Sequence, residues 1–171
     1  MRAVIVYESM FGNTERVARA LAGGLALHGT VDLLNVDDAM GSSFEGTDLI
    51  VAGGPTHTFG LSRANTRETA SQQAGGGHTV SRSGLRDWLA RLPPAPAGTA
   101  VAVFGTRVRK PRWLTGSAAH GTARLLRRRG YRFLARPQDF YVDGMTGPLA
   151  EGELARARQW GEELGTVCVA R

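Results

Sequence analysis

The chain has 171 residues and a formal net charge of +6, from 21 basic and 15 acidic side chains. This length is typical of one domain, and a composition that is 42% hydrophobic and 21% charged is that of a globular protein. The single cysteine, Cys168, excludes an internal disulfide, a Cys-x-x-Cys redox pair and a thiolate metal centre. Any redox chemistry therefore requires a bound organic cofactor.

The positive charge is concentrated in one segment. Residues 107–136 contain ten basic side chains and no acidic one, which leaves 11 basic and 15 acidic residues in the rest of the chain. The remainder thus carries a net charge of −4. No uncharged apolar run reaches the roughly 20 residues that a membrane helix needs, so we expect a cytoplasmic protein without a membrane span.

Strands and helices alternate in the first half of the chain. A continuous apolar run of the kind that a strand buried on both faces requires opens the sequence at 3–7. The further elements expected here, in chain order, are a helix at 13–27, a strand at 30–36, a strand at 48–52, a helix at 62–73 and a glycine-rich loop at 74–83.

The same alternation continues in the second half. The elements expected there are a helix at 84–92, a strand at 99–104, a helix at 117–129, an interrupted strand at 132–135 and 140–142, and a helix at 149–164. This pattern predicts an α/β chain, residues 1–171 forming a single domain. We expect a three-layer, doubly wound fold around a five-stranded, mainly parallel sheet.

In such folds, ligands bind beyond the carboxyl ends of the strands, which directs attention to residues 8–14, 53–61 and 105–116. The first of these loops runs from a strand directly into a helix, where backbone N–H groups and the helix dipole favour an anion. It lacks the Gly-x-x-x-x-Gly-Lys-Ser/Thr and Gly-x-Gly-x-x-Gly patterns of nucleotide-binding loops. A small cradle for one phosphate is one interpretation, and simple helix capping by Ser9 and Asn13 is the other.

Residues 4–18, Val-Ile-Val-Tyr-Glu-Ser-Met-Phe-Gly-Asn-Thr-Glu-Arg-Val-Ala, resemble the N-terminal signature of flavodoxins and flavodoxin-like quinone reductases. Residues 140–164 also resemble part of this family. The resemblance implies a noncovalently bound FMN. It assigns the FMN phosphate to Ser9, Met10, Phe11, Gly12, Asn13 and Thr14.

The second loop, Gly54-Pro55-Thr56-His57-Thr58-Phe59-Gly60, resembles the loop that lines the flavin ring in this family. Pro55 and Phe59 can supply flat apolar contacts, while Thr56, His57 and Thr58 can hydrogen-bond the ring edge. Alternatively, the segment is a turn with Phe59 in the core, and His57 is a solvated loop residue. The histidines show no metal-ligand spacing, so we expect no metal.

The third loop follows the strand at 99–104, where flavodoxins place a second flavin-lining loop. Thr106 and Arg107 are candidates for the pyrimidine edge of the flavin, where a cation would stabilise the anionic reduced ring. Trp113 either stacks on the ring or anchors the loop in the core. No side chain is needed as a nucleophile, so no catalytic residue is assigned.

Three functions remain open at this stage. The first is an FMN-binding protein that transfers electrons, the second an NAD(P)H-dependent quinone or small-molecule oxidoreductase, and the third an FMN-free interaction module. The basic 107–136 segment is a solvated surface, a docking face for an acidic redox partner, or a capture site for an anionic or quinone substrate or for NAD(P)H phosphates. Nucleic-acid binding is not favoured, because no aromatic array interleaves with the charge.

Overall fold

The computed structural model describes residues 1–57, 60–62, 81–144 and 146–171. Its centre is a parallel sheet in the order β2-β1-β3-β4-β5, with β6 also paired to β4. The strands are β1 (Arg2–Tyr7), β2 (Thr30–Asn35), β3 (Leu49–Pro55), β4 (Ala100–Val108), β5 (Arg132–Phe133) and β6 (Gln138–Val142). The expected doubly wound α/β fold is confirmed, and the last predicted strand is present as two pieces, β5 and β6.

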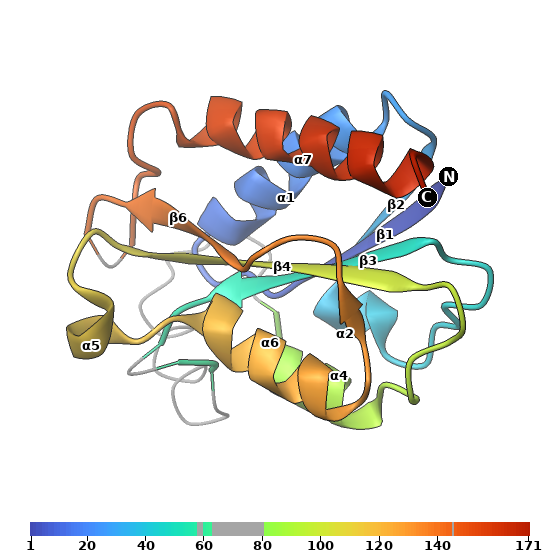
Figure 1. The fold of residues 1–171 in the computed structure, drawn as a ribbon. Coiled ribbons are helices and arrows are strands. Elements are labelled where there is room, and N and C mark those ends of the chain that lie inside the picture. Colours follow the sequence, from blue (N-terminus) through green and yellow to red (C-terminus); the bar gives the residue numbers. More distant parts are fainter. Residues whose placement is uncertain (58–59, 63–80, 145) are drawn as a thin grey trace.

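Helices cover both faces of this sheet, as Figure 1 shows. They are α1 (Asn13–Leu25), α2 (Val36–Ala39), α4 (Leu85–Arg91), α5 (Arg112–Thr115), α6 (Ala118–Arg128) and α7 (Glu153–Val169). Helices α1 and α7 lie on one face, and α2, α4 and α6 lie on the other. Each face has its own apolar core, because β1, β3 and β4 are buried on both sides.

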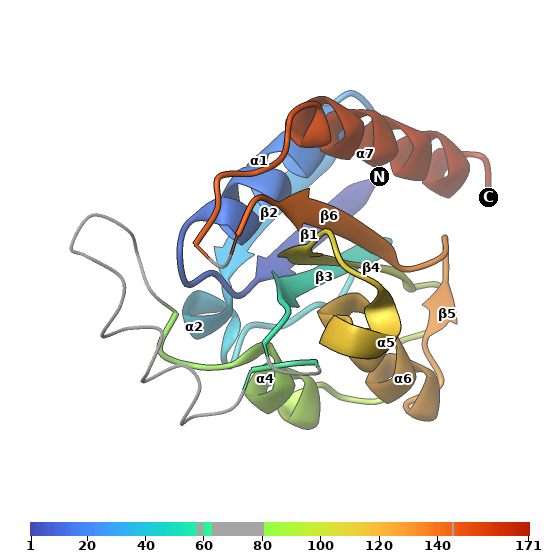
Figure 2. The ribbon, with the colours of Figure 1, turned by 90° about the vertical axis from the view of Figure 1, so that its left-hand side faces the viewer.

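The last strand is interrupted, as the sequence predicted. Both halves pair in parallel with β4: Arg132 and Phe133 lie beside Ala100 and Val101, and β6 lies beside 104–108. Figure 2 shows the two pieces along the same edge of the sheet. The pairing with β6 lengthens β4 beyond its expected end at Phe104, so Thr106 and Arg107 belong to a strand rather than to a loop.

Other boundaries differ for local reasons. Helix α7 begins at Glu153 rather than at Leu149, because Ala150 donates its N–H to the Tyr141 carbonyl and Gly152 caps the helix with a φ of 80°. The short helices α2 and α5 were not predicted, and the helix expected at 62–73 lies almost entirely outside the described residues. Among the helices described, none has the length and apolarity needed to cross a membrane.

Two adjacent glycines of α1 test how closely α1 and α7 pack. A Cβ at Gly24 would lie 2.1 Å from the Arg158 carbonyl oxygen, whereas a Cβ at Gly23 would meet nothing within 4 Å. We expect Gly24→Ala to lower the free energy of unfolding by about 2 kcal/mol through overpacking. Gly23→Ala is the matched control, and it should stabilise the protein by about 0.5–1 kcal/mol because alanine favours helix.

Urea denaturation of the two variants measures both effects. Equal shifts in the unfolding midpoint would contradict the close backbone approach of the two helices.

Candidate functional site

The carboxyl ends of β1, β3 and β4 lie together at one end of the sheet. The chain leaves β1 toward β2 on one side, while β3 lies on the other side of β1. Doubly wound sheets bind ligands at such a switch point. The three segments chosen from the sequence therefore do converge.

The loop after β1 leads into α1 through Gly12, the N-cap residue, whose φ of 80° lies in the left-handed region that glycine tolerates best. Gly12 has no side chain, and within the described part of the chain no side-chain hydrogen bond caps the helix. Ser9 and Asn13 are therefore not capping residues: Asn13 instead donates its amide N–H to the Thr146 carbonyl at 3.0 Å. The first N–H groups of α1 keep their capacity to bind an anion.

Buried polar groups surround the start of this loop. Ser9 is fully buried, and its Oγ has no hydrogen-bond partner among the described residues. Thr14 is also buried, and its hydroxyl lies 2.8 Å from the hydroxyl of Thr106 on β4. Met10 is buried, while Phe11 and Asn13 are partly exposed. A buried hydroxyl without a partner costs free energy, which a ligand oxygen at this position would recover.

Sequence reasoning missed the residues that support this loop. Ser9 donates its N–H to Ser81 Oγ at 3.0 Å and accepts the Ser81 N–H at the same distance. Asn35, at the end of β2, donates to Ser81 Oγ at 2.9 Å. The segment that begins at Ser81 is thereby joined to the first loop. No local pattern signals a contact across 72 residues.

Asp37 holds the same segment from α2. Its carboxylate accepts the N–H groups of Arg82 at 2.8 Å and Ser83 at 2.6 Å. Burial alone would raise the pKa of Asp37, but the hydrogen bonds from Arg82 and Ser83 outweigh it and lower the pKa.

Two backbone hydrogen bonds join His57 and Gly60 in the loop after β3. His57 donates its N–H to the Gly60 carbonyl at 2.8 Å, and Gly60 returns a hydrogen bond at 2.6 Å. Pro55 ends β3, and the Thr56 hydroxyl accepts the N–H of Ala118 at the start of α6. Thr58 and Phe59 lie outside the described residues. The alternative that places Phe59 in the core therefore stays a prediction.

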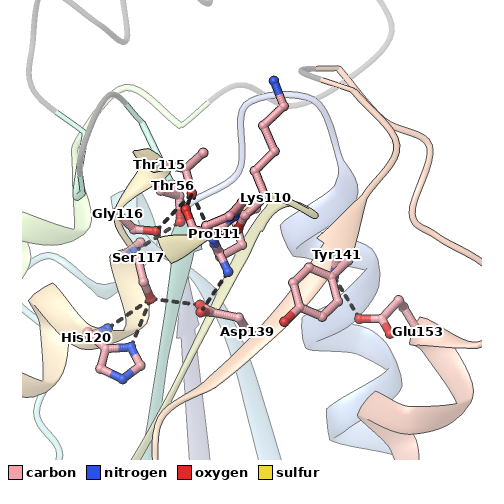
Figure 3. Close-up of polar contacts among 12 residues, drawn as sticks. Thr56, Lys110, Pro111, Thr115, Gly116, Ser117, His120, Asp139, Tyr141 and Glu153 are labelled. Carbon is pink, nitrogen blue, oxygen red and sulfur yellow. Dashed lines mark hydrogen bonds and ion pairs between the residues drawn. The ribbon is translucent and has the colours of Figure 1, made fainter. Parts of the chain in front are cut away.

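Arg107 points into the protein from the end of β4, where it is only 6% exposed. Its guanidinium donates to the Lys110 carbonyl and, at 2.8 Å, to the Thr115 hydroxyl, and it lies 3.7 Å from the Asp139 carboxylate. These contacts join the two ends of the segment that follows β4, at Lys110 and Thr115, which are labelled in Figure 3. Arg107 therefore holds this segment in place, and any contact of its side chain with a flavin stays a prediction.

Trp113 lies on α5 and is 82% exposed, and its neighbour Leu114 is 48% exposed. The alternative in which Trp113 anchors the segment in the core is therefore wrong. Whether it stacks on a flavin stays a prediction.

Comparison with known proteins agrees with this arrangement. A family model described as flavodoxin matches residues 5–106, a stretch that includes the first two loops and the start of the third. The chain belongs to the flavodoxin family. No curated protein sequence matches it significantly.

Several solved flavodoxins share the fold over nearly the whole length. An archaeal flavodoxin has a TM-score of 0.62 at 16% identity, covering 99% of both chains. Flavodoxin 2 from Bacillus cereus has a TM-score of 0.61 at 20% identity, again over 99% of both chains. The two-electron reduced flavodoxin from Megasphaera elsdenii has a TM-score of 0.61 at 18% identity, covering 96% of this chain and 98% of that one.

Proposed function

We propose that this protein binds one FMN noncovalently and transfers electrons through it. The observation that carries the proposal is the first loop: an uncapped α1 N-terminus beside the buried, unpartnered Ser9 hydroxyl, at the switch point of the sheet. This chemistry fits a phosphate group, since N–H groups and hydroxyls are its usual donors. The residues present therefore suit the phosphate end of FMN.

Each segment of the site has a role in this proposal. Residues 9–14 hold the phosphate, while Pro55, Thr56, His57 and Gly60, together with Thr58 and Phe59, line the ring. Thr106 fixes the position of Thr14, since their buried hydroxyls are hydrogen-bonded. FMN, when bound, supplies one- and two-electron transfer.

Arg107 acts on the site from a distance. Its charge is partly compensated by Asp139, so its effect on an anionic reduced flavin is smaller than that of an unpaired cation. Its main contribution is to fix the segment between Lys110 and Thr115.

The surface beside this segment supports the carrier function. Trp113 and Leu114 are exposed on α5, and the exposed Arg109 and Lys110 precede them. A fixed apolar contact flanked by positive charge suits an acidic redox partner, because complementary charge speeds association. We therefore place partner docking on residues 109–114.

One observation favours the reductase alternative. A cavity of about 280 Å³ lies between Gly60 and the start of α6, next to two of the three segments assigned to the flavin. An electron carrier does not require a substrate cavity there, whereas an NAD(P)H-dependent oxidoreductase does.

Absorption spectroscopy tests the proposal. Purified protein incubated with FMN and then desalted is expected to retain a flavin band at about 450 nm, at one FMN per chain. A colourless protein after this treatment would contradict both redox functions and leave the interaction module. Steady NADH oxidation with a quinone by the loaded protein alone would favour the reductase. Fast reduction only by a partner reductase, slowed by salt, would favour the carrier.

A further inference from the structure

The cavity beside α4 and α6 has a strongly basic lining. Arg86 reaches it from the first turn of α4, while His120 and Arg124 reach it from α6. Gly60, Gly116 and Gly121 line the rest of its wall, with Leu61 and Ser117, and none of the described residues that line it is acidic. At about 280 Å³ the cavity lies just below the size range of pockets for whole drug-sized ligands. It therefore suits a small ligand or one group of a larger one.

The two arginines are available to a ligand. Both are exposed, and neither forms a hydrogen bond or ion pair within the described part of the chain. The neighbouring carboxylate of Asp87 accepts the Gly84 N–H at 3.1 Å, where it caps α4. Two positive charges from different helices thus meet at one concavity, which attracts an anion.

His120 forms part of the cavity wall with a fixed orientation. The Ser117 hydroxyl donates its proton to Asp139 at 2.8 Å, so the 3.1 Å contact between Ser117 Oγ and His120 Nδ1 has the imidazole as donor. Figure 3 shows this chain running from Asp139 through Ser117 to the ring of His120. These two hydrogen bonds fix the orientation of the imidazole at the cavity wall.

Binding here does not depend on the N-terminus of α6. The N–H of Ala118 is taken by the Thr56 hydroxyl at 3.0 Å, and that of His120 by the Ser117 hydroxyl at 3.3 Å. The two guanidiniums therefore supply the recognition. Their combined charge of +2 matches a phosphate or diphosphate better than a single carboxylate.

We propose that this cavity binds a phosphate or diphosphate group. Gly60 and Gly116 bound two of the three segments assigned to the flavin, so the bound group would anchor a substrate next to the ring. That use as a substrate anchor rests on the proposed function, whereas anion binding itself does not. The phosphate belongs either to a nicotinamide dinucleotide or to a smaller phosphorylated substrate.

Titration of the FMN-loaded, ¹⁵N-labelled protein with inorganic diphosphate tests the site, because FMN fills the other phosphate cradle. We expect saturable NMR shifts of the amide signals of Gly116 and Gly121. Arg86→Gln and Arg124→Gln should each weaken binding about tenfold. The control is Arg128→Gln, an exposed arginine of α6 outside the cavity lining, which should leave the affinity unchanged.

The outcomes are distinct. Shifts that do not saturate, or equal weakening by Arg128→Gln, would overturn the proposal, since binding would then be nonspecific to the basic segment. If NADH displaces diphosphate from the cavity, the bound group belongs to a dinucleotide. If NADH does not displace diphosphate, the group belongs to a smaller phosphorylated substrate. If the protein takes up no FMN, the same titration of the FMN-free protein still tests anion binding in the cavity. Shifts at residues 116–121 report binding in the cavity, and shifts at residues 9–14 report binding at the first loop.

Discussion

Gly12→Asp is expected to lower the affinity for FMN about 100-fold while the protein stays folded. Gly12 is the N-cap of α1 with a φ of 80°, a conformation that aspartate accepts more readily than most residues. A carboxylate at a helix N-terminus stabilises the helix by about 0.5–1 kcal/mol. The same charge at about 4 Å from a phosphate costs up to about 4 kcal/mol near a protein surface, and a hundredfold loss corresponds to about 2.7 kcal/mol.

Gly12→Asn is the matched control, because it has nearly the same shape without the charge. We expect it to bind FMN within about tenfold of the original chain, measured by quenching of FMN fluorescence on titration. Thermal unfolding without FMN should show Gly12→Asp at least as stable as Gly12→Asn. Equal affinities of both variants for FMN would contradict the placement of the FMN phosphate at this loop.

The fold could be predicted because its signals are local. The run at 3–7 is apolar at every position, as a strand with helices on both faces requires, and β1 occupies Arg2–Tyr7. The break in the last strand was also visible, since Arg136 and Pro137 separate two short apolar runs. Short α5 was not predictable, because four residues after a proline carry no periodicity.

In the candidate site too, the contiguous residues could be predicted from the sequence and the distant ones could not. Residues 9–14 are contiguous, so their residue types gave a phosphate cradle as one of two interpretations, and the resemblance to flavodoxins assigned the phosphate to them. Ser81 and Asn35 support that cradle from 72 and 26 positions away in the chain, and serine and asparagine are common in any loop. The contacts of Arg107 within the protein could not be predicted for a related reason: its partner, Asp139, lies on β6, and their pairing depends on the register of β4 with that strand.

Breaking the Arg107–Asp139 pair is also expected to lower the stability of the protein strongly. The pair is buried, with side chains 6% and 11% exposed, so replacing one partner leaves the other charge uncompensated. Asp139→Asn should lower the free energy of unfolding by about 3 kcal/mol, and Arg107→Met by at least as much. The double variant should recover part of this loss, since neither charge then remains buried alone.

An exposed ion pair provides the control. Arg2 and Asp32 lie closer together, at 3.1 Å, but their side chains are 44% and 52% exposed. Asp32→Asn should therefore change the free energy of unfolding by less than about 0.5 kcal/mol, because water screens the pair. Urea denaturation of all four variants separates the two cases. If Asp139→Asn lowers the free energy of unfolding no more than Asp32→Asn does, then burial does not decide the strength of the Arg107–Asp139 pair.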